Sequence, residues 1–198
     1  MKSGPDSPPA TNSSARGPAR AVFLVGFMGA GKSSAGRALA RQLDWPFEDL
    51  DERIQARERR SIEQIFRESG EPEFRRAEQD ALRELLAELG PSPRVVALGG
   101  GAFVRAENAA LLEQAGVPVV FLDAPVEELF RRCQQESQVE RPLRRDPEQF
   151  RRLYEARRPH YLAAALRIET GGKEIDTVAA EVARALGLEP NGESIKEL

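Results

Sequence analysis

The stretch GFMGAGKS at residues 26–33 decides the fold. It follows a short apolar run at residues 21–25 and precedes a helical pattern over about 32–43. It also fits the pattern G-x-x-x-x-G-K-[ST], in which backbone N–H groups and a helix start surround a phosphate group. The position between a strand and a helix therefore predicts a nucleotide-binding loop in an α/β domain.

Each part of this loop has an expected task. The glycines let backbone N–H groups turn toward phosphate without side-chain clashes. We expect Lys32 to reach the β- and γ-phosphates and the Ser33 hydroxyl to bind Mg²⁺. The residues predicted to bind the nucleotide are Gly29, Ala30, Gly31, Lys32, Ser33 and Ser34.

The composition excludes several classes of protein. A chain of 198 residues with 31% charged residues suits one globular domain. Its net charge of -3 argues against a general nucleic-acid or anionic-membrane binder. The single cysteine, Cys133, allows no internal disulfide, which fits the cytoplasm. Residues 1–20 are rich in Pro, Ser and Gly, so we expect a disordered tail there and a second loose tail at 187–198.

Apolar runs alternate with helical patterns along the rest of the chain. The predicted strands are 21–25, 46–50, 94–98, 118–122 and 166–169. The predicted helices are 32–43, 51–59, 61–68, 71–89, 106–114, 125–135, 147–157 and 175–186. Strands that are continuous apolar runs indicate a parallel sheet covered on both faces.

Three polar or glycine-rich segments end or follow these predicted strands. They are the phosphate-binding loop, Asp49 with Asp51, and the triplet Gly99, Gly100 and Gly101. Ligands of such sheets bind at the carboxyl ends of the strands. We therefore expect the three segments to meet at one edge.

Asp49 lies on the predicted strand 46–50 and Asp51 directly follows it. Residues two apart along an extended strand point to one face, so both are expected to face the site. Two carboxylates there could serve a hydrated Mg²⁺, or one the metal and one a substrate hydroxyl. The alternative is that Asp51 caps the helix that follows.

Arginines supply the positive charge for an anionic substrate. Arg75 and Glu78 share a helix face, either as a surface ion pair or with Glu78 holding Arg75 for a substrate carboxylate. The glycine triplet is either a close backbone approach to a ligand or a tight turn. An arginine from the polar loop around 136–146 could reach a transferring phosphoryl group.

Several motifs in order resemble those of shikimate kinases. The motifs are GFMGAGKS at 26–33, FEDLD at 47–51, SIEQIF at 61–66, GEPEFRRAE at 70–78, ALGGGA at 97–102, RPL at 141–143 and ARRPHY at 156–161. The resemblance covers about residues 21–186 and leaves out both tails. One departure is Arg144, where the family usually has a second leucine after RPL.

The resemblance implies that ATP phosphorylates the 3-hydroxyl of shikimate, a step toward chorismate and the aromatic amino acids. It also implies a P-loop kinase fold, with strand order 2-3-1-4-5, helices on both faces and a mobile lid at about 136–146. The expected partners are shikimate, ATP and Mg²⁺, in a monomeric cytoplasmic enzyme. A gluconate-type kinase or a nucleotide-binding regulatory module is the alternative.

The resemblance assigns a role to each matching position. Lys32, Ser33 and Asp49 would serve phosphate and Mg²⁺, and Asp51 would bind the substrate hydroxyl and orient or deprotonate it. Arg75 and Arg157 would clamp the shikimate carboxylate beside Gly99, Gly100 and Gly101. Arg141 would reach the transferring phosphate from the lid, and Arg132 would lie against adenine. The catalytic groups implied are Asp51, Lys32 and Arg141.

Overall fold

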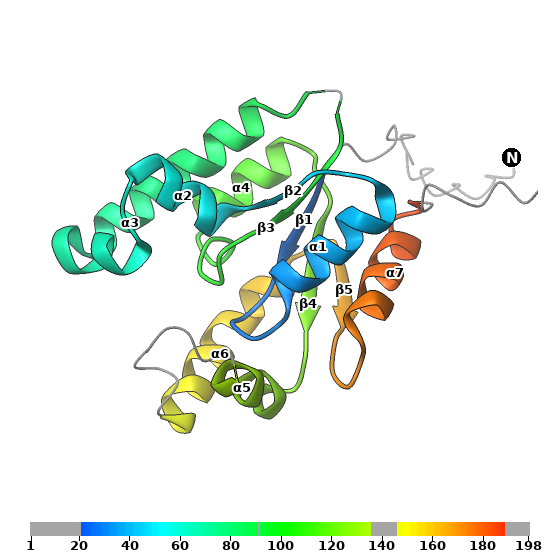
Figure 1. The fold of residues 1–198 in the computed structure, drawn as a ribbon. Helices are drawn as coiled ribbons and strands as arrows, with labels where there is room; N and C mark the ends of the chain where they lie inside the picture. Colours follow the sequence, from blue (N-terminus) through cyan, green and yellow to red (C-terminus); the bar gives the residue numbers. More distant parts are fainter. Residues whose placement is uncertain (1–20, 91, 136–145, 189–198) are drawn as a thin grey trace, which may run out of the picture.

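The computed structural model describes residues 21–90, 92–135 and 146–188 (Figure 1). Its five strands form one parallel sheet in the order β2-β3-β1-β4-β5, which confirms the predicted order. The strands are β1 (Ala21–Val25), β2 (Phe47–Asp49), β3 (Arg94–Ala97), β4 (Val119–Asp123) and β5 (Leu166–Glu169).

Helices cover both faces of the sheet, as predicted. They are α1 (Lys32–Leu43), α2 (Leu50–Glu58), α3 (Ile62–Ala87), α4 (Ala106–Gln114), α5 (Val126–Gln135), α6 (Pro147–Tyr161) and α7 (Ile175–Ala185). Helices α1 and α7 lie side by side in front of the sheet in Figure 1, and α4 lies behind it. Every residue of β1 and β4 is buried, because helices cover both faces of the sheet, and these residues are apolar except for Asp123.

Helix α3 is bent where the sequence predicts a break between two helices. Gly70 has φ 77° and ψ 176°, a conformation outside the helical region. The helical segment that restarts after it tolerates Pro72, because the first turn of a helix leaves N–H groups without helical partners. This second segment presents Arg75 toward the glycine triplet.

Of the predicted lid, the structure describes Asp146 alone. Its side chain accepts hydrogen bonds from the N–H groups of Glu148 and Gln149 and so caps α6. Arg141 lies outside the described residues, as do both predicted tails apart from Gly187 and Leu188. Within the described ranges, none of the helices is long and apolar enough to span a bilayer.

A buried carboxylate ties α6 to the sheet. Asp123, at the end of β4, is only 3% exposed. It accepts hydrogen bonds from the Tyr154 hydroxyl at 3.1 Å, from Arg158 Nη2 at 2.9 Å and from Arg167 Nε at 3.0 Å. These bonds hold the helix that also carries Arg157.

We expect Asp123→Ala to lower the free energy of unfolding by about 1–3 kcal/mol, because it leaves the buried Tyr154 hydroxyl and the Arg158 guanidinium without their carboxylate. Urea denaturation measures the change. Glu169→Ala is the matched control, since Glu169 also pairs with Arg167, at 3.1 Å, but is half exposed. Its expected effect is within about 0.5 kcal/mol. Equal losses in the two variants would contradict the assigned role of Asp123.

Candidate active site

The phosphate-binding loop joins β1 to α1 in a conformation that needs glycine. Gly29 has φ 78°, and a Cβ atom there would lie 2.5 Å from the carbonyl oxygen of Leu129 and 2.9 Å from Cys133 Sγ. Buried Cys133 therefore packs directly beneath the loop. The Lys32 ammonium donates to the carbonyl oxygen of Phe27 at 3.0 Å, which folds this side chain back over the loop.

A cavity of about 180 Å³ brings the loop together with the other two predicted segments. Its lining comprises Met28, Gly29, Gly31, Lys32, Ser33, Ser34, Asp49, Asp51, Leu98, Gly99 and Gly100. The residues come from the ends of three neighbouring strands, β2, β3 and β1. The prediction that one sheet edge gathers them is confirmed.

The reason given for pairing Asp49 with Asp51 is wrong, although both residues line the cavity. β2 ends at Asp49, and Asp51 belongs to the first turn of α2. Asp49 is the residue that caps this helix, since its Oδ1 accepts from the N–H of Asp51 at 3.0 Å. Its other oxygen, Oδ2, accepts from the Ser33 hydroxyl at 2.6 Å. This capping contact therefore places the Asp49 carboxylate at the phosphate-binding loop and the Asp51 carboxylate against the glycine triplet.

The glycine triplet is a close approach of the backbone to two charged side chains. A Cβ atom on Gly99 would lie 2.5 Å from Asp51 Oδ1, and one on Gly101 would lie 2.6 Å from Arg75 Nη1. A Cβ atom on Gly100 would meet its nearest neighbours at 3.7 Å, an ordinary contact. Any larger residue at the first and third positions would displace Asp51 or Arg75.

Arg75 is held by two carboxylates from its own helix. Its Nη1 donates to both oxygens of Glu78, at 3.3 and 3.1 Å, and its Nε and Nη2 donate to Glu71 Oε1 at 3.1 and 3.0 Å. Glu78 is 1% exposed, and this burial raises the pKa of its carboxyl group, while the positive charge of Arg75 lowers it. The ion pair that the sequence left as a possible surface contact is therefore largely buried on the Glu78 side.

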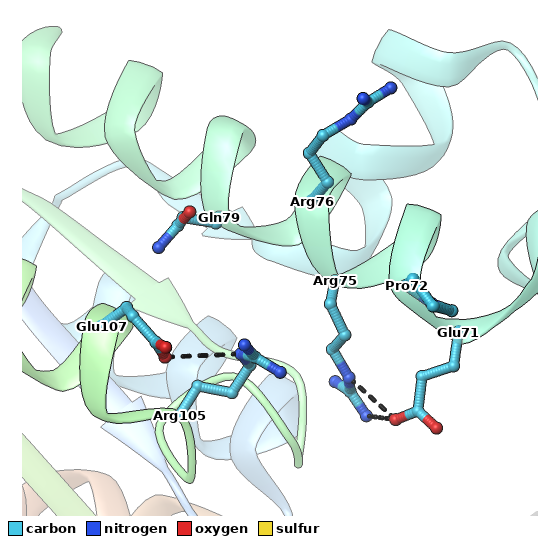
Figure 2. A pocket seen from close by; sticks show the side chains of 7 residues that line it. All are labelled: Glu71, Pro72, Arg75, Arg76, Gln79, Arg105 and Glu107. Carbon is cyan, nitrogen blue, oxygen red and sulfur yellow. Dashed lines mark hydrogen bonds and ion pairs between the residues drawn. The ribbon is translucent and has the colours of Figure 1, made fainter.

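Arg75 also lines a second, larger cavity of about 520 Å³ (Figure 2). The other residues of its lining are Glu71, Pro72, Arg76, Gln79, Arg105 and Glu107. In Figure 2 the Arg75 and Arg105 side chains extend into the space between α3 and the start of α4. Three arginines thus line this cavity, and two of them extend into it.

Helix α6 brings Arg157 to the same glycine triplet. Arg157 Nη1 donates to the carbonyl oxygen of Gly100 at 3.5 Å, and its guanidinium lies 5.9 Å from the ring centre of Phe27. The buried Tyr161 hydroxyl donates to the same carbonyl oxygen. Burial raises the pKa of Tyr161 to about 12, so the hydroxyl keeps its proton at neutral pH. Tyr161 was not predicted as a site residue, because an aromatic residue near a helix end is equally typical of core packing.

Arg132, on α5, also contacts the phosphate-binding loop. Its Nη1 donates to the carbonyl oxygen of Gly29 at 3.4 Å. Its Nη2 donates to Glu128 Oε1 at 2.6 Å and to the carbonyl oxygen of Thr170 at 2.7 Å. Arg132 thus contacts the phosphate-binding loop, and its predicted contact with adenine stays a prediction.

Most of the chain is similar to known shikimate kinases. The family model for shikimate kinase matches residues 28–187. A shikimate kinase from Geobacter metallireducens is 45% identical over 166 residues, covering 82% of this chain and 89% of its own length. One from Thermus thermophilus is 42% identical over 175 residues, covering 85% of this chain and 91% of its own length.

Solved structures agree with the sequence comparison. The shikimate kinase of Acinetobacter baumannii, solved in complex with shikimate, has a TM-score of 0.75 and 34% identity over 85% of this chain and 93% of its own. That of Aquifex aeolicus has a TM-score of 0.74 and 34% identity over 84% and 96%. A gluconokinase from Sinorhizobium meliloti, at 18% identity and a TM-score of 0.56, shares the fold alone. The chain therefore belongs to the shikimate kinase family.

Proposed function

We propose that the chain transfers the γ-phosphoryl group of ATP to the 3-hydroxyl of shikimate, with the groups of the small cavity as its catalytic centre. The observation that carries this proposal is the common cavity of Lys32, Ser33 and Asp51. It places a phosphate-binding loop beside a carboxylate that can accept a hydroxyl proton. Phosphoryl transfer needs positioning and charge stabilisation more than covalent chemistry, and these groups supply both.

On the donor side, Lys32 and the loop N–H groups bind the ATP phosphates. The donor set beside them fits Mg²⁺, since the Ser33 hydroxyl and the Asp49 carboxylate lie 2.6 Å apart and both are hard oxygen ligands. Mg²⁺ usually keeps several waters and takes one or two protein ligands together with phosphate oxygens. When bound, it would supply positive charge against the phosphates. Arg132 would border the nucleotide from the far side of the loop.

On the acceptor side, Asp51 would accept the proton of the shikimate hydroxyl as that oxygen attacks phosphorus. Arg75 and Arg157 would bind the shikimate carboxylate. Support comes from the glycine triplet between them, with Arg75 against Gly101 and Arg157 against the carbonyl oxygen of Gly100. A third arginine, Arg141, is proposed to reach the transferring phosphoryl group, although it lies outside the described residues.

Acceptor-dependent release of ADP from ATP tests this function. ADP release should rise strongly with shikimate and stay at its basal rate with gluconate. A hydroxy acid without the cyclic skeleton should not satisfy Asp51 and the two arginines at once. Stimulation by gluconate, or equal rates with and without any acceptor, would refute the proposal.

The glycine triplet allows a test that separates the two halves of the acceptor site. Gly99→Ala places a methyl group against Asp51, so we expect kcat to fall about tenfold, because small misplacements of a catalytic group are costly. Gly101→Ala places a methyl group against Arg75, so we expect the KM for shikimate to rise about tenfold. Steady-state kinetics measures both.

Each of these two variants is the control for the other, since both add one methyl group to the same loop. Neither glycine has a positive φ, so alanine adds no backbone strain. Identical changes in kcat and KM for the two variants would mean that the loop simply distorts, and would refute the division of roles.

The remaining proposals concern the chain as a whole. We infer one catalytic unit over about residues 21–186, acting as a monomer in the cytoplasm. The single sheet with one continuous buried cluster supports a single unit. Light scattering in solution tests the monomer, and a second species at twice the mass would contradict it.

A further inference from the structure

Every nitrogen of the Arg75 guanidinium already donates to a carboxylate of the protein. Nη1 donates to Glu78, while Nε and Nη2 both donate to the single oxygen Oε1 of Glu71. Figure 2 shows Glu71 and Arg75 joined in this way at the rim of the larger cavity. The substrate carboxylate proposed to bind Arg75 therefore meets a guanidinium whose Nε–Nη2 edge is already occupied by Glu71.

The two protein carboxylates differ greatly in how easily they can leave. The side chain of Glu71 is 63% exposed, whereas that of Glu78 is 1% exposed. An exposed ion pair on a helix contributes little, because water solvates both charges once they separate. A buried carboxylate that loses its cation is left with a large desolvation cost. Glu71 is thus the partner that can leave, and Glu78 is the partner that stays.

The position that Glu71 holds is also the one that suits an incoming carboxylate. Nε and Nη2 form one edge of the guanidinium, and a carboxylate binds such an edge with two parallel N–H···O bonds. Nη1 is confined on the other side, between Glu78 and Gly101. With both glutamates ionised, the group formed by Arg75, Glu71 and Glu78 has a net charge of −1, which disfavours the binding of a further anion while Glu71 stays in place.

We infer that Glu71 is a specificity-determining residue that occupies the carboxylate position on Arg75 and is displaced when the substrate binds. This inference rests on the proposed role of Arg75 in binding the substrate carboxylate. A carboxylate ligand replaces Glu71 on Arg75 and restores the lost contact. An uncharged ligand leaves Glu71 in place and gains nothing from Arg75.

The test is Glu71→Gln, which removes the competing charge and keeps the size of the side chain. We expect the KM for shikimate, and its dissociation constant by titration calorimetry, to fall about two- to fivefold, the range for an exposed ion pair. The substitution should change KM and not kcat. It should shrink in about 1 M salt, because screening weakens exposed charge interactions. The methyl ester of shikimate, which lacks the carboxylate charge, should show no gain.

Glu73→Gln is the matched control. It removes the same charge from the same helix, but Glu73 pairs with Arg76 at 2.7 Å and not with Arg75. We expect its KM for shikimate to equal that of the parent chain. Glu71→Ala should change KM in the same direction as Glu71→Gln, and a melting curve for each variant verifies that it folds.

The outcomes separate this inference from the proposed function. An unchanged or raised KM in Glu71→Gln, or an equal gain with the methyl ester, would overturn the role of Glu71. A gain of the same size in Glu73→Gln would also overturn it, since the effect would then be general electrostatics. Arg75→Lys, measured in parallel, tests the role of Arg75 itself, and an unchanged KM there would refute the proposed function instead.

Discussion

Replacing Asp51 by asparagine is expected to lower kcat by about 10²–10⁴-fold while ATP binding persists. Asparagine has nearly the same shape, so the contact with Gly99 and the position at the start of α2 are kept. It cannot accept the proton of the shikimate hydroxyl, which is the step that Asp51 is proposed to perform. Asp51 lines the small cavity but does not belong to the phosphate-binding loop, so we expect ATP binding to be unaffected. Steady-state kinetics and a direct ATP-binding titration measure the two properties.

The control for this variant is Glu52→Gln, one residue further along α2. Glu52 pairs with Arg37 at 2.6 Å on the protein surface and is 63% exposed. Removing its charge should leave kcat within about twofold, because exposed ion pairs contribute little. A nearly normal kcat in Asp51→Asn would refute the assignment of the proton acceptor. Loss of ATP binding in that variant would mean that Asp51 supports the donor side instead.

The sheet and its functional edge are predictable from sequence because the strands are short, continuous apolar runs. A parallel sheet built from such runs brings the residues after each strand to the same edge. That reasoning placed the phosphate-binding loop, Asp49 and the glycine triplet together, and the small cavity confirms it. The strand order, by contrast, came from the family resemblance, because apolar runs do not specify their neighbours.

The prediction that strand alternation extends from Asp49 to Asp51 was wrong, because Asp51 belongs to the first turn of α2. The alternation of side chains along a strand was extended to Asp51, two residues past Asp49, which ends β2 and caps α2. The cap itself could have been found, since an aspartate before a helical segment is a common helix start. A helix predicted to begin at residue 51 suggested Asp51 as its cap, whereas α2 begins at Leu50 and its cap is Asp49. The two carboxylates still line one cavity, because the first turn of a helix stays close to the strand it follows.

Other parts of the site depend on contacts that no local pattern contains. The Tyr161 hydroxyl and the Arg157 guanidinium both reach the carbonyl oxygen of Gly100, about sixty positions away in the chain. The Arg75 partners show a related limit. Helical spacing predicts that Glu71 and Glu78 can both reach Arg75, but burial decides that one is exposed and the other enclosed. Tertiary packing creates that difference, and the proposed displacement of Glu71 depends on it.

Arg75→Lys is expected to raise the KM for shikimate by about tenfold to a hundredfold, with a smaller change in kcat. A guanidinium offers a carboxylate two parallel N–H donors on one edge, whereas an ammonium is a point charge without such an edge. The lysine would also be drawn toward buried Glu78, which needs a cation, and would leave the position that faces the substrate. Initial rates at varied shikimate and saturating ATP measure the change, and the KM for ATP should stay the same.

The neighbouring residue provides the control, because Arg76→Lys makes the same substitution one position along α3. Arg76 pairs with Glu73 at 2.7 Å, and its side chain is 71% exposed. It lines the larger cavity but contacts neither Glu78 nor the glycine triplet among the described interactions. If Arg76→Lys raised the KM for shikimate as much as Arg75→Lys, the substrate carboxylate would depend on both arginines of the larger cavity and not on Arg75 alone. If only Arg75→Lys raised it, the carboxylate position would be fixed at the one arginine that Glu78 holds against Gly101.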